Sequence, residues 1–284
     1  IVMKRTSQFF VFVFITGLAL TSCEKESKSI ASLDYEIQVS EDDAIATDIF
    51  DDVINDVEFL ETVFSLKSAA AVVCRTVDRE WKADTLYLTI TYNGECENEV
   101  YNRTRTRSGQ INVKQFNGPR FMPGATRKIT FNNYYMNDVK VEGEHTIISQ
   151  GYNEDSTAIT YLVNVNNGSL TFEDGVVVTR NAEKTRLHYF GENRYDLSDD
   201  YWIINGTSTG TNFQGNSYSR TISNLKALKT CVHFVSGTVT LNINDEAPVM
   251  LNYGEGGCDD KAWVSKHGES KEIILREKRN KNRK

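Results

Sequence analysis

Apolar and polar side chains alternate along most of the chain, and this period of two restricts the fold more than any other feature. Between residues 85 and 92, Leu86, Leu88, Ile90 and Tyr92 share one face, while threonines and Tyr87 occupy the other. Such alternation is typical of a half-buried β-strand. Similar runs lie at residues 110–116, 126–135, 139–148, 157–165, 175–190, 201–209, 216–222, 232–243, 247–253, 262–266 and 271–276.

Short turn sequences separate these runs. They are Asn93-Gly94, Asn117-Gly118, Asn167-Gly168, Asp174-Gly175 and Asn244-Asp245, whose residues tolerate the positive φ of tight hairpins. Roughly a dozen strands at this spacing predict a mainly β fold, a large antiparallel β-meander over residues 67–276. No second long helical stretch supplies the crossovers of a parallel sheet, so we expect none.

One long helix is expected before the strands. Its apolar positions follow one another at intervals of three or four residues, as Ile45, Ile49, Val53, Val57, Leu60 and Phe64. Ser40 is placed to cap the N-terminus, and Asp43 stands at the capping-box position. We therefore predict an N-terminal amphipathic helix over residues 40–66 that packs its apolar stripe on the sheet.

The predicted helix is strongly acidic. Nine Asp or Glu and no Lys or Arg fall between Ser40 and Phe64. In one interpretation the acids form a docking face for a basic partner. In the other they form the solvated outer face of a helix packed on the sheet. We favour the solvated face, because charge runs of this kind usually face water.

The first residues have the pattern of an export signal. Lys4 and Arg5 precede an almost wholly apolar run from Phe9 to Leu20. The run is too short to span a ~30 Å hydrocarbon core but suits a signal peptide. It ends in Leu20-Thr21-Ser22-Cys23, which resembles the lipobox of bacterial lipoproteins, whose cysteine is acylated and becomes the new N-terminus. We predict a signal peptide at residues 1–22 and a lipidated Cys23.

Both ends of the mature chain are expected to lie outside the folded domain. Residues 23–39 are predicted to form a lipidated tether, and Glu24-Lys25-Glu26 resembles the acidic signals that carry lipoproteins to the cell surface. The predicted location is the outer membrane, lipid-anchored, at its periplasmic face or at the cell surface. Residues 277–284 form a basic tail, which we interpret as a solvated end. Contact with anionic lipid, with polysaccharide or with the acidic helix is the alternative.

The four other cysteines, an even number in an exported chain, predict two disulfides. If Asn244-Asp245 is a two-residue turn, the hairpin register places Cys231 opposite Cys258, within disulfide range. By elimination Cys74 pairs with Cys96. That second pair requires a bulge or a loop that folds back at residues 93–95.

A pattern of turns and cysteines resembles a known family. Its segments are Cys74, residues 85–96, Arg105-Thr106-Arg107-Ser108-Gly109, Phe131-Asn132-Asn133-Tyr134-Tyr135, Val141-Glu142-Gly143, Ser236-Gly237-Thr238-Val239 and Gly257-Cys258-Asp259-Asp260-Lys261-Ala262. Together they resemble a family of uncharacterised β-rich lipoproteins of Gram-negative bacteria, over about residues 70–275. That family has no assigned activity, so the resemblance implies a fold and a location and no catalytic residue.

No local motif points to a cofactor or a metal. The sequence lacks a Gly-rich phosphate loop, a nucleophile elbow and a His-Glu-x-x-His pattern. The histidines, none with a second ligand at zinc spacing, are His145, His188, His233 and His267. The aspartates at Asp196, Asp199, Asp200, Asp259 and Asp260 do not match a calcium loop, and we interpret them as solvated turn carboxylates.

Two classes of function remain open. The first is a non-enzymatic binding or structural module of the envelope, with a glycan or another envelope protein as its partner. The alternative is a glycan hydrolase whose two carboxylates come together only in space. Aromatic side chains can stack on sugar rings, and the candidate ligand-binding residues are Tyr134, Tyr135, Tyr201 and Trp202. These residue types are also ordinary strand formers.

Composition excludes two other classes. The chain has 39 acidic against 32 basic residues, which argues against a nucleic-acid partner. A mean hydropathy of −0.43 excludes a protein with several membrane spans.

Overall fold

The computed structural model describes residues 33–65, 74–98, 103–192, 197–244 and 246–276. The chain divides into two units, residues 1–32 and Leu33–Lys284, and every described residue belongs to the second. The predicted signal peptide, Cys23 and the basic tail lie outside the described residues.

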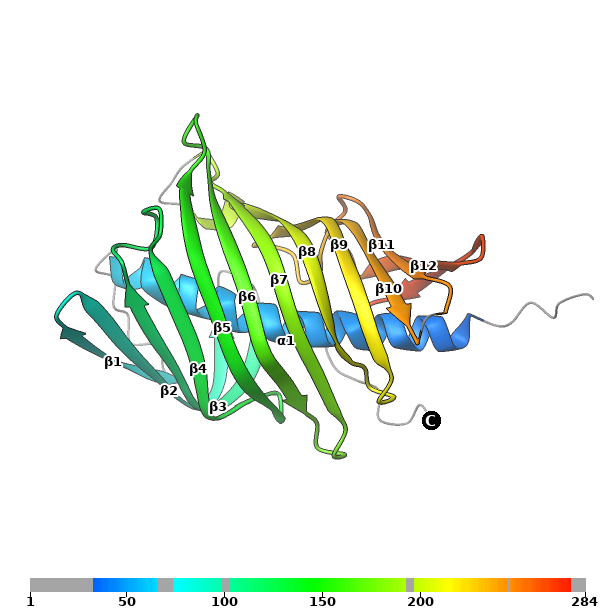
Figure 1. Ribbon diagram of the computed structural model, residues 1–284, viewed down its shortest axis with the longest axis horizontal. Coiled ribbons are helices and arrows are strands. Elements are labelled where there is room, and N and C mark those ends of the chain that lie inside the picture. Colours follow the sequence, from blue (N-terminus) through cyan, green and yellow to red (C-terminus); the bar gives the residue numbers. More distant parts are fainter. Residues whose placement is uncertain (1–32, 66–73, 99–102, 193–196, 245, 277–284) are drawn as a thin grey trace, which may run out of the picture. The chain divides into compact units, whose positions relative to one another are not determined.

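Among the described residues there is one α-helix, followed by strands and one short 3-10 helix (Figure 1). The elements are α1 (Asp34–Ser65), β1 (Arg75–Lys82), β2 (Thr85–Asn98), β3 (Arg103–Phe116), β4 (Thr126–Met136), β5 (Val139–Tyr152), β6 (Ala158–Thr171), β7 (Val177–Tyr189), η1 (Leu197–Asp199), β8 (Tyr201–Thr211), β9 (Ser217–Leu228), β10 (Ser236–Ile243), β11 (Val249–Glu255), β12 (Lys261–Lys266) and β13 (Glu269–Ile274).

The described strands form one 13-stranded antiparallel sheet, in which each strand pairs with the next along the chain. This confirms the predicted mainly β class and the meander. Alternation does not reveal β1, because most of its side chains are exposed and apolar residues are few. In the described part of the chain, no helix has both the length and the apolar character needed to cross a membrane.

α1 is longer than predicted. It begins at Asp34, so residues 34–39 of the predicted tether are helical, and Ser40 lies buried inside the helix. The predicted capping role of Ser40 is therefore wrong. The extra turns bury Ile37 and Val39, and Asp34 and Glu36 occupy the first turn, where the helix dipole favours negative charge.

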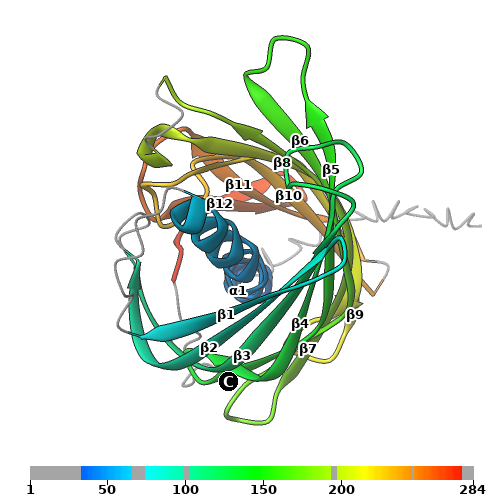
Figure 2. The ribbon, with the colours of Figure 1, turned by 90° about the vertical axis from the view of Figure 1, so that its left-hand side faces the viewer.

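The sheet curls around α1, which lies along its concave face (Figure 2). The middle of the helix packs its apolar stripe, including Ile49 and Val53, against a core built by β1–β7. The beginning of the helix packs Ile37 and Val39 into a second core built by β8–β13. The predicted packing of the helix on the sheet is confirmed, and the buried helix joins the two cores.

Two of the predicted turns lie inside strands. Asn93-Gly94 belongs to β2, which stays in register with β3 as far as Asn98. Asn167-Gly168 lies in β6 at a register shift. A Cβ at Gly168 would come within 2.8 Å of the Arg180 carbonyl oxygen and 3.0 Å of the Phe50 ring. Close approach of the neighbouring strand β7 and of the helix, and not a turn, explains this glycine.

Candidate functional site

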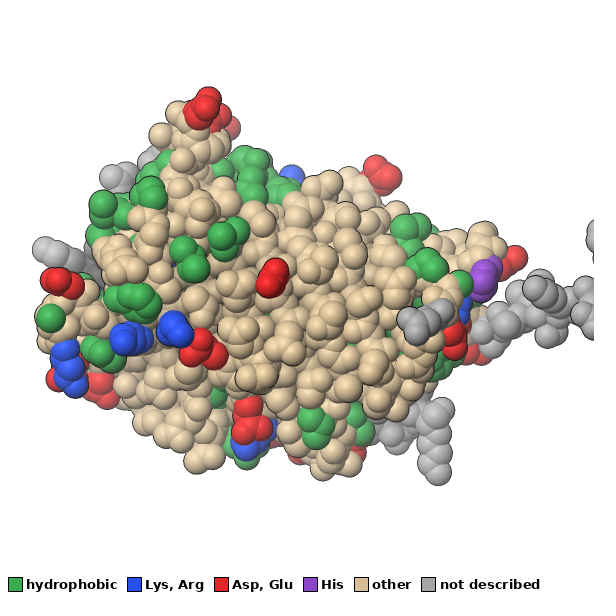
Figure 3. Space-filling model, viewed as in Figure 1, with side chains coloured by type: hydrophobic (Ala, Val, Ile, Leu, Met, Phe, Trp, Pro, Cys, Tyr) green, Lys and Arg blue, Asp and Glu red, His purple; other side chains and the backbone are tan. Residues whose placement is uncertain are grey.

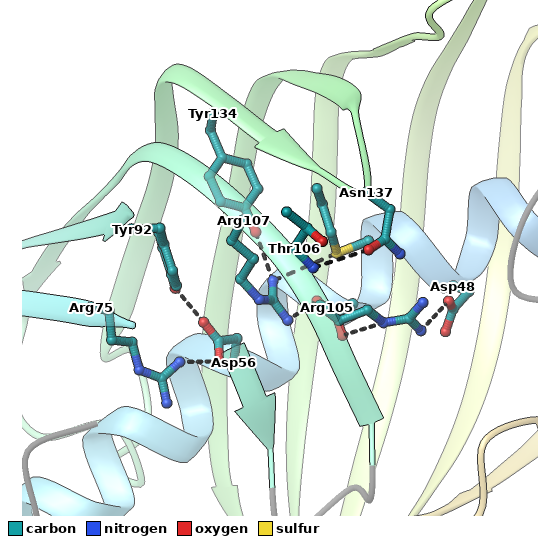
Figure 4. A network of polar contacts seen from close by, with 11 residues as sticks. Asp48, Asp56, Arg75, Tyr92, Arg105, Thr106, Arg107, Tyr134 and Asn137 are labelled. Atoms are coloured by element: carbon teal, nitrogen blue, oxygen red, sulfur yellow. Dashed lines mark hydrogen bonds and ion pairs between the residues drawn. The ribbon is translucent and has the colours of Figure 1, made fainter. Parts of the chain in front are cut away.

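The acidic face of α1 is buried against basic side chains of its own sheet (Figure 4). Three aspartates, one helical turn apart, form ion pairs with β1 and β3: Asp48–Arg105 at 2.6 Å, Asp52–Arg107 at 2.6 Å and Asp56–Arg75 at 2.5 Å. Both sequence-based interpretations of this face, the solvated one and the docking one, are therefore wrong. The basic partner is the inner face of the sheet.

A second row of contacts joins α1 to β7 and β9. Its ion pairs are Asp43–Arg180 at 2.7 Å, Asp51–Lys184 and Asp43–Arg220 at 3.5 Å. The Thr47 hydroxyl accepts hydrogen bonds from Arg180 and Arg220, at 3.0 and 2.8 Å. A signal for these pairs exists in the sequence, because basic residues alternate at 105 and 107 and at 180, 184 and 186.

Asp51 and Asp56 stay ionised at neutral pH, because the pKa of each is lowered. Burial by itself would raise the pKa of Asp51, but attraction to Lys184 and Arg186 outweighs it and lowers the pKa. The same balance, with Arg107 and Arg75 as the cations, lowers the pKa of Asp56. A general acid for glycoside hydrolysis needs the opposite shift.

Several of these acids line a small internal cavity beside aromatic rings. The cavity lies between α1 and residues 227–234 and has a volume of about 60 Å³. Its lining includes Asp48, Asp52, Trp202 and Tyr253. Ordinary ligand pockets have volumes of roughly 300 Å³ or more, so a sugar ring does not fit here.

A larger hollow lies among the β1–β2 hairpin, β3 and the β3–β4 loop, and we call it the mouth pocket. Its volume is about 690 Å³, within the range of small-molecule sites. The described lining residues are Arg79, Trp81, Ala83, Asp84, Leu86, Leu88, Gln115, Asn117, Gly118, Pro119, Arg120 and Phe121.

Strand register sets the floor of the mouth pocket. Trp81 faces Leu86 and Arg79 faces Leu88 across β1 and β2, while Gln115 faces Leu86 from β3. Facing residues share one side of a sheet, so these side chains all lie on the inner face. Leu86 and Leu88 are buried, whereas Trp81 is 63% exposed.

The β3–β4 loop forms the opposite wall and presents Phe121, which is 44% exposed. Arg120 Nη1 donates a hydrogen bond to the Glu58 carbonyl oxygen of α1 at 3.3 Å. Gly124 N donates to the Ser149 carbonyl oxygen of β5 at 2.8 Å. Because both bonds tie the loop to the core, the mouth pocket is preformed.

The four predicted ligand-binding aromatics do not lie together. Tyr134 and Trp202 are 0% and 2% exposed on the inner face, where neither can contact a glycan at the surface. Tyr135 is 38% exposed. Tyr201 lies on the outer face, stacked on Tyr189 at 4.7 Å with the Lys226 amine 4.4 Å above its ring. Trp81, the most exposed of the three tryptophans, is not among the four candidates.

The Cys231–Cys258 disulfide is confirmed, with a Cα–Cα distance of 5.4 Å. The predicted register behind it is wrong, because Leu241 faces Val249 and a bulge follows at Ser236–Thr238. Both cysteines lie in loops beyond the strand ends.

Cys74 also belongs to a disulfide. The side chain of Cys96 lies outside the described residues, so the Cys74–Cys96 pairing stays a prediction. Asn93 N donates to the Cys74 carbonyl oxygen at 3.1 Å, and β2 continues through residues 93–95 without folding back. The loop expected there is therefore absent.

One of the supposed turn carboxylates is buried. Asp200 accepts hydrogen bonds from His188 Nε2 at 2.7 Å and from Lys229 Nζ at 3.2 Å, and its side chain is 1% exposed. The His188 ring also stacks on Trp202. Since these contacts join β7, β8 and the end of β9, this cluster has a structural role.

The remaining acids match the expectation of solvated turns, except that Asp196 lies outside the described residues. Asp259 and Asp260 are exposed, and Asp199 is exposed with Oδ2 accepting from Glu192 N at 2.9 Å. Among the described residues, no group of three or more His, Cys, Asp or Glu could hold a metal ion.

Comparisons of the chain with protein-family models, with curated proteins and with solved structures found no match. The structure therefore defines a class of protein by two features. They are an antiparallel sheet that curls around a helix, and a preformed hollow with aromatic side chains on its walls.

Proposed function

We propose that this protein is a non-catalytic, lipid-anchored binding module of a Gram-negative envelope, and that the mouth pocket binds a sugar ring. The observation that carries the proposal is Trp81, whose indole stays 63% exposed beside a preformed hollow. Exposed aromatic area is unfavourable in water, and an apolar sugar face that covers the ring recovers that free energy.

The rim of the mouth pocket supplies the polar half of such a site. Asn117 offers an amide and Asp84 a carboxylate acceptor. Gln115, at the edge of the floor, adds an amide that already donates to the Gly118 carbonyl oxygen at 3.3 Å. Sugar hydroxyls are donors and acceptors at once, so they fit a mixed rim of this kind. The apolar floor of Leu86 and Leu88 completes the usual composition of a small-ligand site.

The small number of carboxylates in the mouth pocket favours binding over hydrolysis. Asp84 is the single acid among the described residues that line the mouth pocket. Most glycoside hydrolases need two carboxyl groups on opposite sides of the scissile bond. The acids of α1 are engaged with arginine and lysine in a cavity of about 60 Å³.

Calorimetric titration with a panel of neutral and acidic oligosaccharides tests the proposal. We expect Trp81→Ala to weaken binding at least tenfold, and Phe121→Ala to weaken it less. Trp263→Ala is the matched control, because Trp263 is 37% exposed on β12 and does not line the pocket. An equal loss in the control, or no oligosaccharide bound by the wild-type protein, would overturn the proposal.

The hydrolase alternative has its own readout. Incubation with the same oligosaccharides should release no new reducing ends. If the wild-type protein releases them and Asp84→Asn does not, the mouth pocket is catalytic and the proposed function is wrong.

The lipid anchor is tested independently of the pocket. Metabolic labelling with a palmitate analogue should mark the wild-type protein and not the Cys23→Ala variant. Label that persists after the substitution would remove the anchor from the proposal.

A further inference from the structure

Over β7–β10 the outer face of the sheet carries fewer charged side chains than the inner face, which is the reverse of an ordinary soluble protein. On β7 the buried inner positions include Arg180, Lys184 and Arg186. The outer positions between them are Asn181, Glu183 and Thr185. Figure 3 shows the result over the middle of the sheet, a broad surface with few hydrophobic or charged side chains.

The polar outer side chains of β7–β10 lie in ranks that cross the strands, and we call these ranks the hydroxyl face. The three ranks are Thr179–Thr211–Ser217, Asn181–Thr209–Ser219–Asn242 and Glu183–Thr207–Thr221–Thr240. Neighbours in a rank are roughly 5 Å apart, and successive ranks roughly 7 Å apart. Ten of these eleven side chains are Ser, Thr or Asn, and Glu183 is the exception.

Strand propensity accounts for only part of this composition. Threonine favours strands, but asparagine is depleted in them. Surfaces of soluble proteins commonly carry charges at roughly a quarter to a third of positions. In this chain 25% of residues are charged, yet many of those charges face inward. The scarcity of charge on the hydroxyl face is therefore a property of that surface and not of the composition.

Much of the hydroxyl face is available to a partner. Thr207, Thr209, Ser219 and Thr221 are exposed, and no hydrogen bond to another described residue engages their hydroxyls. Each hydroxyl is both donor and acceptor. The lack of large apolar side chains in the ranks disfavours a protein partner, whose interface would need an apolar core.

We infer that the hydroxyl face binds an uncharged, flexible polysaccharide along its length. An acidic polymer would have to desolvate charges that find no cation in the ranks, and it would meet Glu183. The face is convex and twisted (Figure 2), so it fits a chain that bends and not a flat crystalline surface. The inference deepens the proposed function, since it names the class of glycan and a second surface that holds it.

Affinity electrophoresis in gels that contain a soluble neutral glucan or galactomannan tests the inference, with alginate as the acidic comparison. The test variant is Thr209→Lys/Ser219→Glu, a facing pair on β8 and β9. It covers the face with long side chains while net charge stays constant and a cross-strand ion pair forms. The control is Thr91→Lys/Gln110→Glu, a half-buried facing pair on β2 and β3, in which the new ion pair replaces a side-chain hydrogen bond of 3.2 Å.

We expect the neutral polymer to retard the wild-type protein and the control, and the test variant to lose at least tenfold in affinity. Trp81→Ala separates the two surfaces. If Trp81→Ala abolishes retardation and the test variant does not, the hydroxyl face is not a binding surface, while the mouth pocket still is. Equal retardation by alginate, or no retardation of the wild-type protein, would also overturn the inference.

Discussion

Arg107 on β3 and Asp52 on α1 meet at 2.6 Å, with 2% and 11% of their side chains exposed. Arg107 also donates to the Tyr134 hydroxyl at 2.6 Å. A buried pair of this kind contributes little compared with a well-packed apolar pair, but removal of Arg107 leaves the Asp52 carboxylate buried with only the more distant Arg105 Nε, at 3.9 Å, as its cation.

We therefore expect Arg107→Met alone to lower the free energy of unfolding by about 3–5 kcal/mol. The double variant Asp52→Leu/Arg107→Met should lose clearly less than the sum of the two single variants. Urea unfolding of the four proteins measures this coupling. Glu80→Gln, at the exposed Lys82–Glu80 pair, should leave the midpoint unchanged. Strictly additive losses at Asp52 and Arg107 would contradict the pairing.

A charge placed on the apolar stripe of α1 should unfold the protein. Val53 is 0% exposed between the helix and the sheet, so Val53→Asp buries an unpaired carboxylate. We expect a loss of several kcal/mol and a fall of the thermal midpoint, while Tyr35→Asp at the exposed start of the helix should change little. An unchanged midpoint for Val53→Asp would mean that the helix is not part of the core.

His145 should make the protein sensitive to mild acid. It is 0% exposed near Phe50 and Phe131, and burial lowers its pKa from 6.5 to about 3. Below pH 6.5 this ring is protonated in the unfolded chain, whereas in the folded protein it stays neutral. Stability is therefore lost as the pH falls from about 6.5 towards 3, by about 1.4 kcal/mol per pH unit.

In His145→Leu, about one proton fewer should be taken up on unfolding, so the free energy of unfolding should depend less steeply on pH. Urea unfolding between pH 4.5 and 7 measures the slope, and His267→Leu, at an exposed turn, is the control. His188 also has a pKa lowered by burial, so part of the slope remains. Asp51 and Asp56 act in a lower pH window, because their pKa values are lowered from 3.8 and they cost stability only when the pH falls below about 4. An unchanged slope in His145→Leu would contradict a neutral buried histidine.

The Cys231–Cys258 bond should stabilise the end of the sheet. It closes a sequence separation of 27 residues, which gives about 3.5 kcal/mol on the chain-entropy model. Unfolding of Cys231→Ser/Cys258→Ser measures the loss. Peptide mapping without reductant should find Cys231 joined to Cys258 and Cys74 joined to Cys96, and a Cys74–Cys231 peptide would contradict both assignments.

The sequence by itself determined the architecture. Alternation with a period of two specifies strands, the absence of further long helical stretches excludes crossovers, and the stripe from Ile45 to Leu60 specifies the helix. These signals are local, because each reflects only which face of a single strand or helix is buried.

Only the tertiary structure decided whether the charged side chains face water or the interior. An acidic face such as that of Asp48 and Asp52 looks the same in sequence whether water or arginine lies opposite. The outcome depended on the sheet curling around α1, which placed Arg105 and Arg107 inside. The mouth pocket has the same origin, since Trp81 and Phe121 line one hollow only because strand register and a tethered loop place them on its two walls.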